Sequence, residues 1–316
     1  MPSALKSSMP TVFIDGEAGT TGLEIRERLA GMRDIAVRSI AAERRKEPAA
    51  RAELMREVDL VVLCLPDDAA KEAVALAGEL GDDAPRIVDA STAHRISAGW
   101  TYGFAEMSGA QANEIANARL VTNPGCYPTG AIALLRPLVD TGILPADHPV
   151  TINAVSGYSG GGKSMIASYE TEKTAPAFEL YGLGLEHKHV PEIEKYSHLA
   201  RRPIFVPSVG NFRQGMLVSV PLHLDTLPGK QSVAKIEDAL RGHYAGGGQV
   251  SVVAAETLKG RIAAETLAGK DEMQLAVFGN EKLGQAVLVA RLDNLGKGAS
   301  GAAVQNIRLM LGLAAA

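Results

Sequence analysis

The sequence predicts an α/β protein in which a doubly wound parallel sheet is followed by an α+β domain with a mixed or antiparallel sheet. Up to about residue 140, short apolar runs alternate with helical patterns, which is typical of parallel sheets with helices on both faces. Beyond that point, predicted strands follow one another with fewer helices, which is typical of an α+β domain. We therefore expect a Rossmann-like domain from residues 1–127 and 295–316, and a second domain from residues 128–294.

The composition excludes several classes of function. The 316 residues are 46% hydrophobic and carry a net charge of −4, which indicates a packed core and no basic surface for nucleic acid. Only 4% of the residues are aromatic, which argues against base stacking. No apolar run reaches the roughly 18 residues of a membrane span. Residues 1–10 lack the apolar segment of a signal peptide, so we expect a cytoplasmic protein whose two cysteines are free thiols.

The first nucleotide-binding feature is a glycine-rich loop between a predicted strand at residues 12–15 and a predicted helix. Glycines at these positions let the backbone turn tightly and approach a pyrophosphate, which then lies at the helix N-terminus. Thr21 and Glu24 fit a capping box that opens the helix. The alternative is a plain turn between a strand and a helix. The cofactor contacts predicted in this loop are Gly16, Gly19, Thr20, Thr21 and Gly22.

The end of the second predicted strand, residues 35–40, indicates which coenzyme is bound. In dinucleotide-binding folds an acid at this place holds the ribose 2′-hydroxyl, whereas arginine accommodates a 2′-phosphate. Arg44, Arg45 and Lys46 follow here, which favours NADP, and Glu43 is the one argument for NAD. The alternative is a solvated charged loop. We assign Arg44 and Arg45 to the cofactor.

Three further strands are predicted at residues 60–65, 87–90 and 119–122. Cys64 lies inside the first of these apolar runs and is expected to be structural. Pro66 ends that run, and Asp67 or Asp68 is expected to cap a helix at residues 69–80. Since ligands bind at the carboxyl ends of parallel strands, Ser91 is assigned to the cofactor and Asn123 to the substrate.

Cys126 follows a sharp turn at Asn123-Pro124-Gly125 and precedes an apolar helical pattern. A thiol at a helix N-terminus faces the positive end of the helix dipole, and this position lowers a cysteine pKa from about 8.5. Cys126 is therefore a candidate nucleophile. The alternative is a small residue that fills the core.

The second domain is predicted from segments of strand and helix character. The strands are at residues 150–155, 204–206, 216–224, 250–255, 274–277 and 286–292, and the helices at 164–178, 191–199 and 232–244. Two loops carry candidate substrate contacts. Ser156 and Lys163 bound a glycine-rich turn that can receive an anion, or that is simply a flexible connection. Arg213 can fork onto a carboxylate or phosphate, or lie at the surface.

His187 and His189 are two residues apart, so in an extended chain their side chains point the same way. Histidine is the natural general acid–base near neutral pH. A zinc site is the rival reading, but no third ligand cluster is evident, so we predict no metal. Ordinary surface histidines are the other alternative.

The C-terminal segment carries another glycine-rich loop followed by a predicted helix. A glycine-rich loop at residues 293–301 precedes a helix with Val304, Ile307 and Leu311 on one face. The pattern predicts that this helix packs on the nucleotide domain, or docks elsewhere as a simple terminal helix. Asn294, at the start of the loop, is assigned to the cofactor.

Three motifs together resemble the N-acetyl-γ-glutamyl-phosphate reductase family, relatives of the aspartate-semialdehyde and glyceraldehyde-phosphate dehydrogenases. They are Asn-Pro-Gly-Cys-Tyr-Pro-Thr at 123–129, His-Lys-His-Val-Pro-Glu-Ile at 187–193, and Asn-Leu-Gly-Lys-Gly-Ala-Ser-Gly-Ala-Ala-Val-Gln-Asn at 294–306. The resemblance spans nearly the whole chain and is greatest to the short, second type of the reductase. Lys163 stands where an arginine is commoner in the family.

The resemblance implies NADPH-dependent reduction of an acyl phosphate to an aldehyde in arginine biosynthesis. Cys126 would form a thioester, and His189 or His187 would move protons and hold the thiolate as an ion pair. Lys163 and Arg213 would hold substrate anions. The family also implies a homo-oligomer, a dimer or tetramer, formed through the second domain's sheet. The rivals are a dehydrogenase that acts on aspartyl phosphate and a catalytically idle NADP-binding regulator.

Overall fold

The computed structural model describes residues 9–314, whose contacts divide the chain into two compact units. The first unit contains the described residues up to Ala105, Ala110–Pro124 and the residues from Ala299 on. The second unit contains Glu106–Gly109 and Gly125–Gly298. No described helix has the length and apolar character that crossing a membrane requires.

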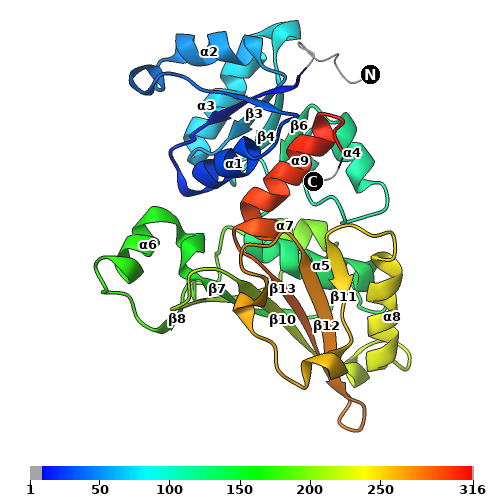
Figure 1. Ribbon diagram of the computed structural model, residues 1–316. Coiled ribbons are helices and arrows are strands. Elements are labelled where there is room, and N and C mark those ends of the chain that lie inside the picture. The colour runs from blue at the N-terminus through cyan, green and yellow to red at the C-terminus, as the bar shows by residue number, and fades with distance from the viewer. Residues whose placement is uncertain (1–8, 315–316) are drawn as a thin grey trace. The chain divides into compact units, whose positions relative to one another are not determined.

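The first unit is built on a six-stranded sheet with the order β2-β1-β3-β4-β6-β5. Figure 1 labels its strands β3, β4 and β6. All its neighbouring strands are parallel, which confirms the predicted parallel sheet. Its strands are β1 Thr11–Asp15, β2 Ala36–Arg38, β3 Leu60–Leu63, β4 Arg86–Asp89, β5 Thr101–Tyr102 and β6 Leu120–Thr122.

Helices cover both faces of this sheet because successive strand residues point to opposite sides. Val12 and Ile14 of β1 pack in the cluster that contains buried side chains of α1, α4 and α9, whereas Phe13 packs with those of α2 and α3. The helix that the tail pattern predicts is α9, and it lies in this unit. The helices are α1 Thr20–Ala30, α2 Pro48–Glu57, α3 Asp67–Gly78, α4 Gln111–Asn117 and α9 Gly301–Met310.

The second unit contains a seven-stranded mixed sheet with the order β11-β12-β13-β10-β7-β9-β8. Only the pairs β7–β9 and β11–β12 are parallel, which confirms the predicted mixed sheet. Its strands are β7 Thr151–Gly157, β8 Phe178–Leu180, β9 Ile204–Gly210, β10 Met216–His223, β11 Val250–Val252, β12 Met273–Asn280 and β13 Gln285–Leu292. Its helices are α5 Cys126–Asp140, α6 Gly162–Glu170, α7 Val190–Tyr196 and α8 Val233–His243.

Helix α5 is almost entirely apolar, and it contacts strands β10, β12 and β13 as well as helices α7 and α8. A helix that is apolar on every side is buried rather than amphipathic. The core of the second unit therefore forms around α5, and the N-terminus of that helix, which carries Cys126, is fixed by this packing.

Helix α6 is shorter than predicted. The expected helix at 164–178 ends at Glu170, and residues 178–180 form the edge strand β8 instead. Pro176 disfavours helical backbone at the residue before it, and Lys173 has a φ of 53°. The predicted helix therefore breaks within residues 171–177.

Both predicted helix caps are wrong. Helix α1 begins at Thr20 with Gly19 as its N-cap, and no side chain caps it. Glu24 instead accepts a hydrogen bond from the Ser300 hydroxyl at 2.9 Å. Helix α3 begins at Asp67 itself, whose carboxylate accepts from the backbone N–H of Thr92 at 2.9 Å. Both carboxylates therefore form hydrogen bonds with residues far along the chain, and neither caps its own helix.

Three histidines of the second unit, His148, His187 and His243, have a pKa lowered chiefly by burial. In the unfolded chain their pKa returns to about 6.5, so the unfolded state binds protons first as the pH falls. We expect the free energy of unfolding in urea to decrease from about pH 7 to about pH 5, by at most about 1.4 kcal/mol per histidine and pH unit. His243→Gln should reduce this decrease; a free energy that rises toward the acid side would contradict the account.

Candidate active site

Cys126 is the first residue of α5, directly after the turn that follows β6. Gly125 is the N-cap, with φ −72° and ψ 152°, so the chain changes from extended to helical at the cysteine. Cys126 is partly exposed and is not in a disulfide. The thiol therefore lies at the positive end of a 15-residue helix, in the place that activates cysteine nucleophiles.

The first turn of α5 has few backbone N–H groups to offer. Pro128 has none, the Thr129 N–H donates to the Gly125 carbonyl at 3.0 Å, and the Gly125 N–H donates to Glu192 at 3.1 Å. The Tyr127 N–H has no acceptor among the described residues. It is therefore an available donor beside the thiol for an oxyanion.

Cys126 opens into a cavity of about 250 Å³ that lies wholly within the second unit. Its wall is formed by the end of β7, the glycine-rich turn before α6, the segment before α7, and β9. The lining residues are Cys126, Tyr127, Ser156, Gly157, Gly160, Gly161, Met165, Tyr181, His187, Lys188, His189 and Val209.

His187 and His189 both face this cavity, with ring centroids 4.8 Å apart. They do not lie in extended chain as predicted, because His189 is the N-cap of α7, with φ −83° and ψ −16°. His189 is buried, so the surface alternative is wrong for it. The His189 backbone N–H donates to His187 Nδ1 at 3.2 Å.

That contact fixes the tautomer of His187. Since Nδ1 accepts, the proton of the neutral ring is on Nε2. Burial and the nearby Lys188 both lower the pKa of His187, which keeps the ring neutral near pH 7. His187 is therefore a neutral donor through Nε2. No group of three or more His, Cys, Asp and Glu residues within 9–314 is arranged to hold a metal ion.

Glu192 belongs to the motif at 187–193, and its sequence position predicts no role for it. It is 1% exposed on α7, and its carboxylate accepts the Gly125 N–H directly before Cys126. A buried carboxylate that accepts a backbone N–H fixes the position of that peptide. Glu192 therefore holds the turn that carries the thiol. The one sequence signal for this role is its place three residues after His189.

The predicted substrate residues occupy different surroundings. Ser156 is buried in the cavity wall. Lys163 is exposed on α6, and Arg213 pairs with Glu170 outside the lining. Asn123 belongs to the first unit, where its side chain donates to the Ala299 carbonyl at 2.9 Å. The structure thus brings only Ser156 of this set to the thiol's cavity.

Asn294, which was assigned to the cofactor, is buried in the second unit. Its amide donates to the Ser159 hydroxyl at 2.9 Å and accepts from the Gly215 N–H at 2.8 Å. It thereby connects the glycine-rich turn before α6 to the loop that carries Arg213. These contacts give Asn294 a structural role in the cavity wall.

Lys297 is the most buried cation near the site. It is 1% exposed, and its Nζ lies 2.6 Å from Glu106 and 3.0 Å from the Gln249 side-chain oxygen. The next residue, Gly298, leaves no room for a side chain, because an added Cβ would lie 2.8 Å from the Cys126 Cβ. The Lys297–Glu106 pair therefore anchors the segment that packs directly against the cysteine.

The glycine-rich loop of the first unit borders a cavity of about 180 Å³ at the carboxyl ends of β1 and β3. In the strand order β2-β1-β3 the chain turns to opposite sides of β1, and such a switch point is where ligands bind. Gly16 has a φ of +91°, and an added Cβ would lie 2.3 Å from the Cys64 carbonyl oxygen. Only glycine fits this close approach.

The cations after β2 separate in the structure. Arg45 and Lys46 line this cavity, whereas Arg44 pairs with Glu47 at 3.0 Å. Arg45 is held by Glu17, 2.6 Å away, and the hydroxyl of Ser39 also donates to Glu17, at 2.9 Å. Ser39 directly follows β2, so the place where an acid would hold a 2′-hydroxyl carries a serine.

Ser91 lies at the carboxyl end of β4, as predicted for a ligand contact. Its hydroxyl donates to Asp89 at 2.8 Å, and the Nδ1 of His94 lies 2.6 Å from the same carboxylate. Asp89 is fully buried.

The second cysteine, Cys64, is a much weaker acid than an ordinary thiol. Burial, followed by the charges of Asp89 and Asp15, raises the pKa of its thiol to about 12.

The sequence and fold of this chain are similar to those of known dehydrogenases and reductases. Residues 126–294 match the family model of the semialdehyde dehydrogenase dimerisation domain. N-acetyl-gamma-glutamyl-phosphate reductases of Brucella ovis and Brucella canis are each 57% identical over 310 residues, which cover 96% of this chain and 99% of theirs.

Solved structures share the fold. Aspartate semialdehyde dehydrogenase II from Vibrio cholerae superposes with a TM-score of 0.71 at 16% identity, covering 97% of this chain and 99% of that one. Aspartate semialdehyde dehydrogenase with NADP from Candida albicans gives a TM-score of 0.68 at 14% identity, covering 96% and 99%.

Proposed function

Since the chain belongs to the N-acetyl-γ-glutamyl-phosphate reductase family, we propose that it reduces N-acetyl-γ-glutamyl phosphate to N-acetylglutamate 5-semialdehyde and phosphate with NADPH, in arginine biosynthesis. The family membership confirms the resemblance that the three motifs indicate. The observation that carries the activity is the cavity in which Cys126 at a helix N-terminus meets His187 and His189. We propose that the first unit binds NADP and the second carries the chemistry.

Cys126 performs the covalent step. Its thiolate attacks the acyl carbon, the carbon–oxygen bond to phosphate breaks, and a thioester forms. Arg45 and Lys46 would hold NADPH, which would supply the hydride that converts the thioester carbonyl to the thiohemiacetal oxyanion. The Tyr127 N–H stabilises the oxyanion, and a cavity histidine gives it a proton and takes that proton back as the carbon–sulfur bond breaks. The aldehyde leaves and the thiolate is restored.

The first unit fits a dinucleotide with a 2′-phosphate. The tight turn at Gly16 packs against the Cys64 carbonyl, where a Cβ would not fit, Arg45 and Lys46 line the cavity beside it, and Ser39 stands where an acid would favour NAD. Arg45 and Lys46 would hold the 2′-phosphate, with Arg45 already positioned by Glu17.

This placement predicts the coenzyme preference. Arg45→Ala should raise the KM for NADPH by roughly tenfold or more, the cost of one charge-assisted hydrogen bond, and leave NADH turnover unchanged. Arg44→Ala is the matched control, because Arg44 pairs with Glu47 outside the cavity. Steady-state kinetics with both coenzymes make the comparison. A wild-type preference for NADH would contradict the assignment.

The substrate anions have two candidate partners outside the cavity lining, Lys163 and Arg213. Arg213 is half-exposed and paired with Glu170, so a substrate carboxylate would have to compete with that pair. We propose both cations as substrate contacts because Asn294 connects the turn directly before Lys163 to the loop that carries Arg213.

A dehydrogenase acting on aspartate semialdehyde is the second candidate, favoured by the shared fold of those enzymes. Assays of both semialdehydes with phosphate and NADP⁺ separate the candidates. Turnover of N-acetylglutamate semialdehyde is the expected result, and turnover of aspartate semialdehyde alone would overturn the proposal. An idle regulator would bind NADP but leave both semialdehydes unchanged.

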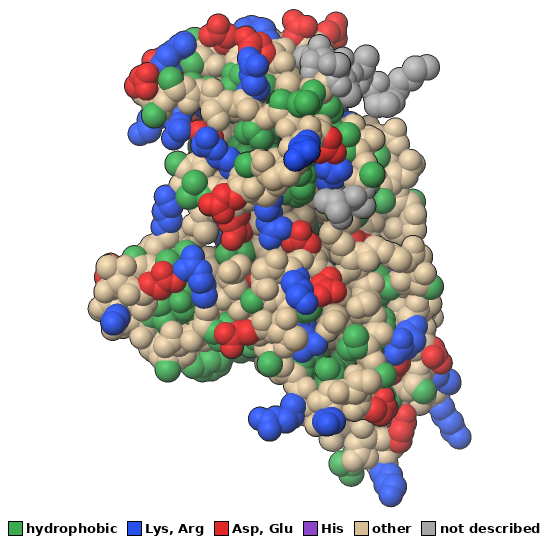
Figure 2. Space-filling model, viewed as in Figure 1, with side chains coloured by type: hydrophobic (Ala, Val, Ile, Leu, Met, Phe, Trp, Pro, Cys, Tyr) green, Lys and Arg blue, Asp and Glu red, His purple; other side chains and the backbone are tan. Residues whose placement is uncertain are grey.

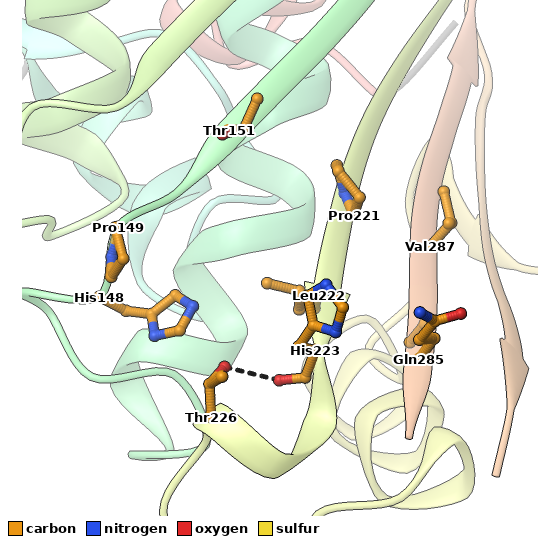
Figure 3. A pocket seen from close by; sticks show the side chains of 10 residues that line it. His148, Pro149, Thr151, Pro221, Leu222, His223, Thr226, Gln285 and Val287 are labelled. Carbon is orange, nitrogen blue, oxygen red and sulfur yellow. Dashed lines mark hydrogen bonds between the residues drawn. The ribbon is translucent and has the colours of Figure 1, made fainter. Parts of the chain in front are cut away.

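We propose a cytoplasmic homo-oligomer assembled through the sheet of the second unit. The matched family model is a dimerisation domain. On this sheet Ile204 and Val287 are exposed apolar side chains, 50% and 39% accessible, and an open cavity of about 680 Å³ lies beside Val287 (Figure 3). That cavity is lined by His148, Pro149, Thr151, Pro221, Leu222, His223, Thr226, Gln285, Ala286 and Val287.

The visible surface carries no separate patch of one charge. In Figure 2, Lys and Arg side chains are interspersed with Asp and Glu side chains on the face shown. This mixture agrees with the net charge of −4 and with a small-molecule substrate.

A further inference from the structure

Tyr181 lies in the wall of the cysteine cavity and has no part in the mechanism above. It precedes the two histidines in the chain, and its ring centroid is 5.7 Å from that of His187. Its hydroxyl lies 3.2 Å from the hydroxyl of Tyr127, the residue after the nucleophile. Burial raises the pKa of Tyr181 to about 12, so the phenol keeps its single proton at neutral pH.

The place of that proton follows from a chain of hydrogen bonds. The Tyr127 hydroxyl lies 2.9 Å from the backbone carbonyl of Ser208, which can only accept, so Tyr127 donates there. Burial also raises the pKa of Tyr127, so its hydroxyl keeps its single proton, and the Ser208 carbonyl accepts a hydrogen bond through that proton. Tyr181 must therefore donate to Tyr127. Its oxygen is left with lone pairs alone for any ligand in the cavity.

The proposed substrate has one matching group. At neutral pH its carboxylate, acyl carbonyl and ionised phosphate are acceptors, whereas the N–H of its acetamido group is a donor. Met165 and Val209 line the same cavity with apolar atoms, which suit the methyl of an acetyl group.

We infer that the Tyr181 hydroxyl oxygen accepts a hydrogen bond from the amide N–H of the substrate's acylated amino group. This inference rests on the proposed function and deepens it. Tyr181 is then a specificity residue that recognises the acylated amine, and it takes no part in proton transfer to the thiohemiacetal. Because the Tyr181 proton is donated to Tyr127, the Tyr181 oxygen can only accept, and it discriminates against analogues that lack the N–H.

The test compares two substrates in the semialdehyde-oxidising direction. One is N-acetylglutamate semialdehyde, and the other is its ester isostere, 2-acetoxy-5-oxopentanoate, in which oxygen replaces the N–H. The wild-type enzyme should use the ester with a kcat/KM about tenfold lower, the worth of one hydrogen bond. Tyr181→Phe should lower kcat/KM about tenfold for the amide, mainly through KM, and leave the ester unaffected.

Tyr244→Phe is the matched control. The Tyr244 hydroxyl is buried and donates to the Ala133 carbonyl at 2.9 Å, but it does not line the cavity. This variant loses a comparable buried hydrogen bond and should leave both substrates unaffected. Tyr127→Phe, by contrast, frees the Tyr181 proton to turn toward the cavity, and should weaken use of the amide more than use of the ester.

Equal losses for amide and ester in Tyr181→Phe, or no loss for either, would overturn the inference while leaving the proposed function in place. Unchanged discrimination in Tyr127→Phe would also overturn it. A wild-type enzyme that oxidises aspartate semialdehyde but not N-acetylglutamate semialdehyde is a different result, which refutes the proposed function itself.

Discussion

Cys126→Ser is expected to lower kcat for N-acetyl-γ-glutamyl phosphate by about three orders of magnitude or more. Catalytic groups that act together lose most of their effect when the nucleophile alone is removed. The hydroxyl of serine is scarcely ionised at neutral pH, and an oxygen ester accepts hydride less readily than a thioester does. Steady-state kinetics with NADPH measure the loss. NADP binding, followed by fluorescence titration, should be unchanged, because the cavity lined by Arg45 and Lys46 lies in the first unit.

Cys64→Ser is the matched control for that experiment. Cys64 lies directly after β3, and its raised thiol pKa of about 12 makes it a poor nucleophile at neutral pH. The variant should keep its activity, and iodoacetamide should label Cys126 in it at the wild-type rate. Retention of substantial activity in Cys126→Ser would mean that the chemistry belongs to another residue.

Lys297→Met is expected to destabilise the second unit by about 3–5 kcal/mol, the usual effect of removing one partner of a buried ion pair. The substitution leaves Glu106, which is also buried, without the cation 2.6 Å away. Burial lowers the pKa of Lys297, which shows the cost of keeping this charge inside. Urea denaturation followed by circular dichroism measures the loss.

Two further variants make this prediction specific. Lys270→Met removes one partner of an exposed pair, 3.4 Å from Glu272, and should change stability by less than about 1 kcal/mol. Lys297→Met combined with Glu106→Gln removes both charges and should recover part of the loss. A single Lys297→Met variant as stable as Lys270→Met would show that the pair does not anchor the segment beside Cys126.

Local patterns predicted the parts of the fold that local physics decides. The apolar run at 60–65 and the glycine loop at 16–22 needed only neighbouring residues to be recognised, and the turn before Cys126 was visible as Asn-Pro-Gly. Strand β8 was missed because Phe178–Leu180 is short and pairs with Val209 and its neighbours far along the chain. The short helices α2 and α4 and strand β5 were also missed.

The site shows the same division. Cys126, His187, His189 and Ser156 were selected from sequence, and the structure gathers them around one cavity. The contacts of Glu17, Tyr181 and Glu192 were not foreseen, because each joins residues that no periodic pattern connects. Tyr181 and Tyr127 are 54 residues apart, and Glu192 and Gly125 are 67 apart.

The central claim is that Cys126 carries the acyl group as a thioester. The most direct test omits phosphate: enzyme, N-acetylglutamate semialdehyde and NADP⁺ are mixed, and NADPH absorbance, intact mass and the masses of proteolytic peptides are recorded. We predict a burst of about one NADPH per subunit, with the N-acetylglutamyl group on the peptide that contains Cys126. A burst that is absent, or an acyl group found on any other residue, would contradict the account.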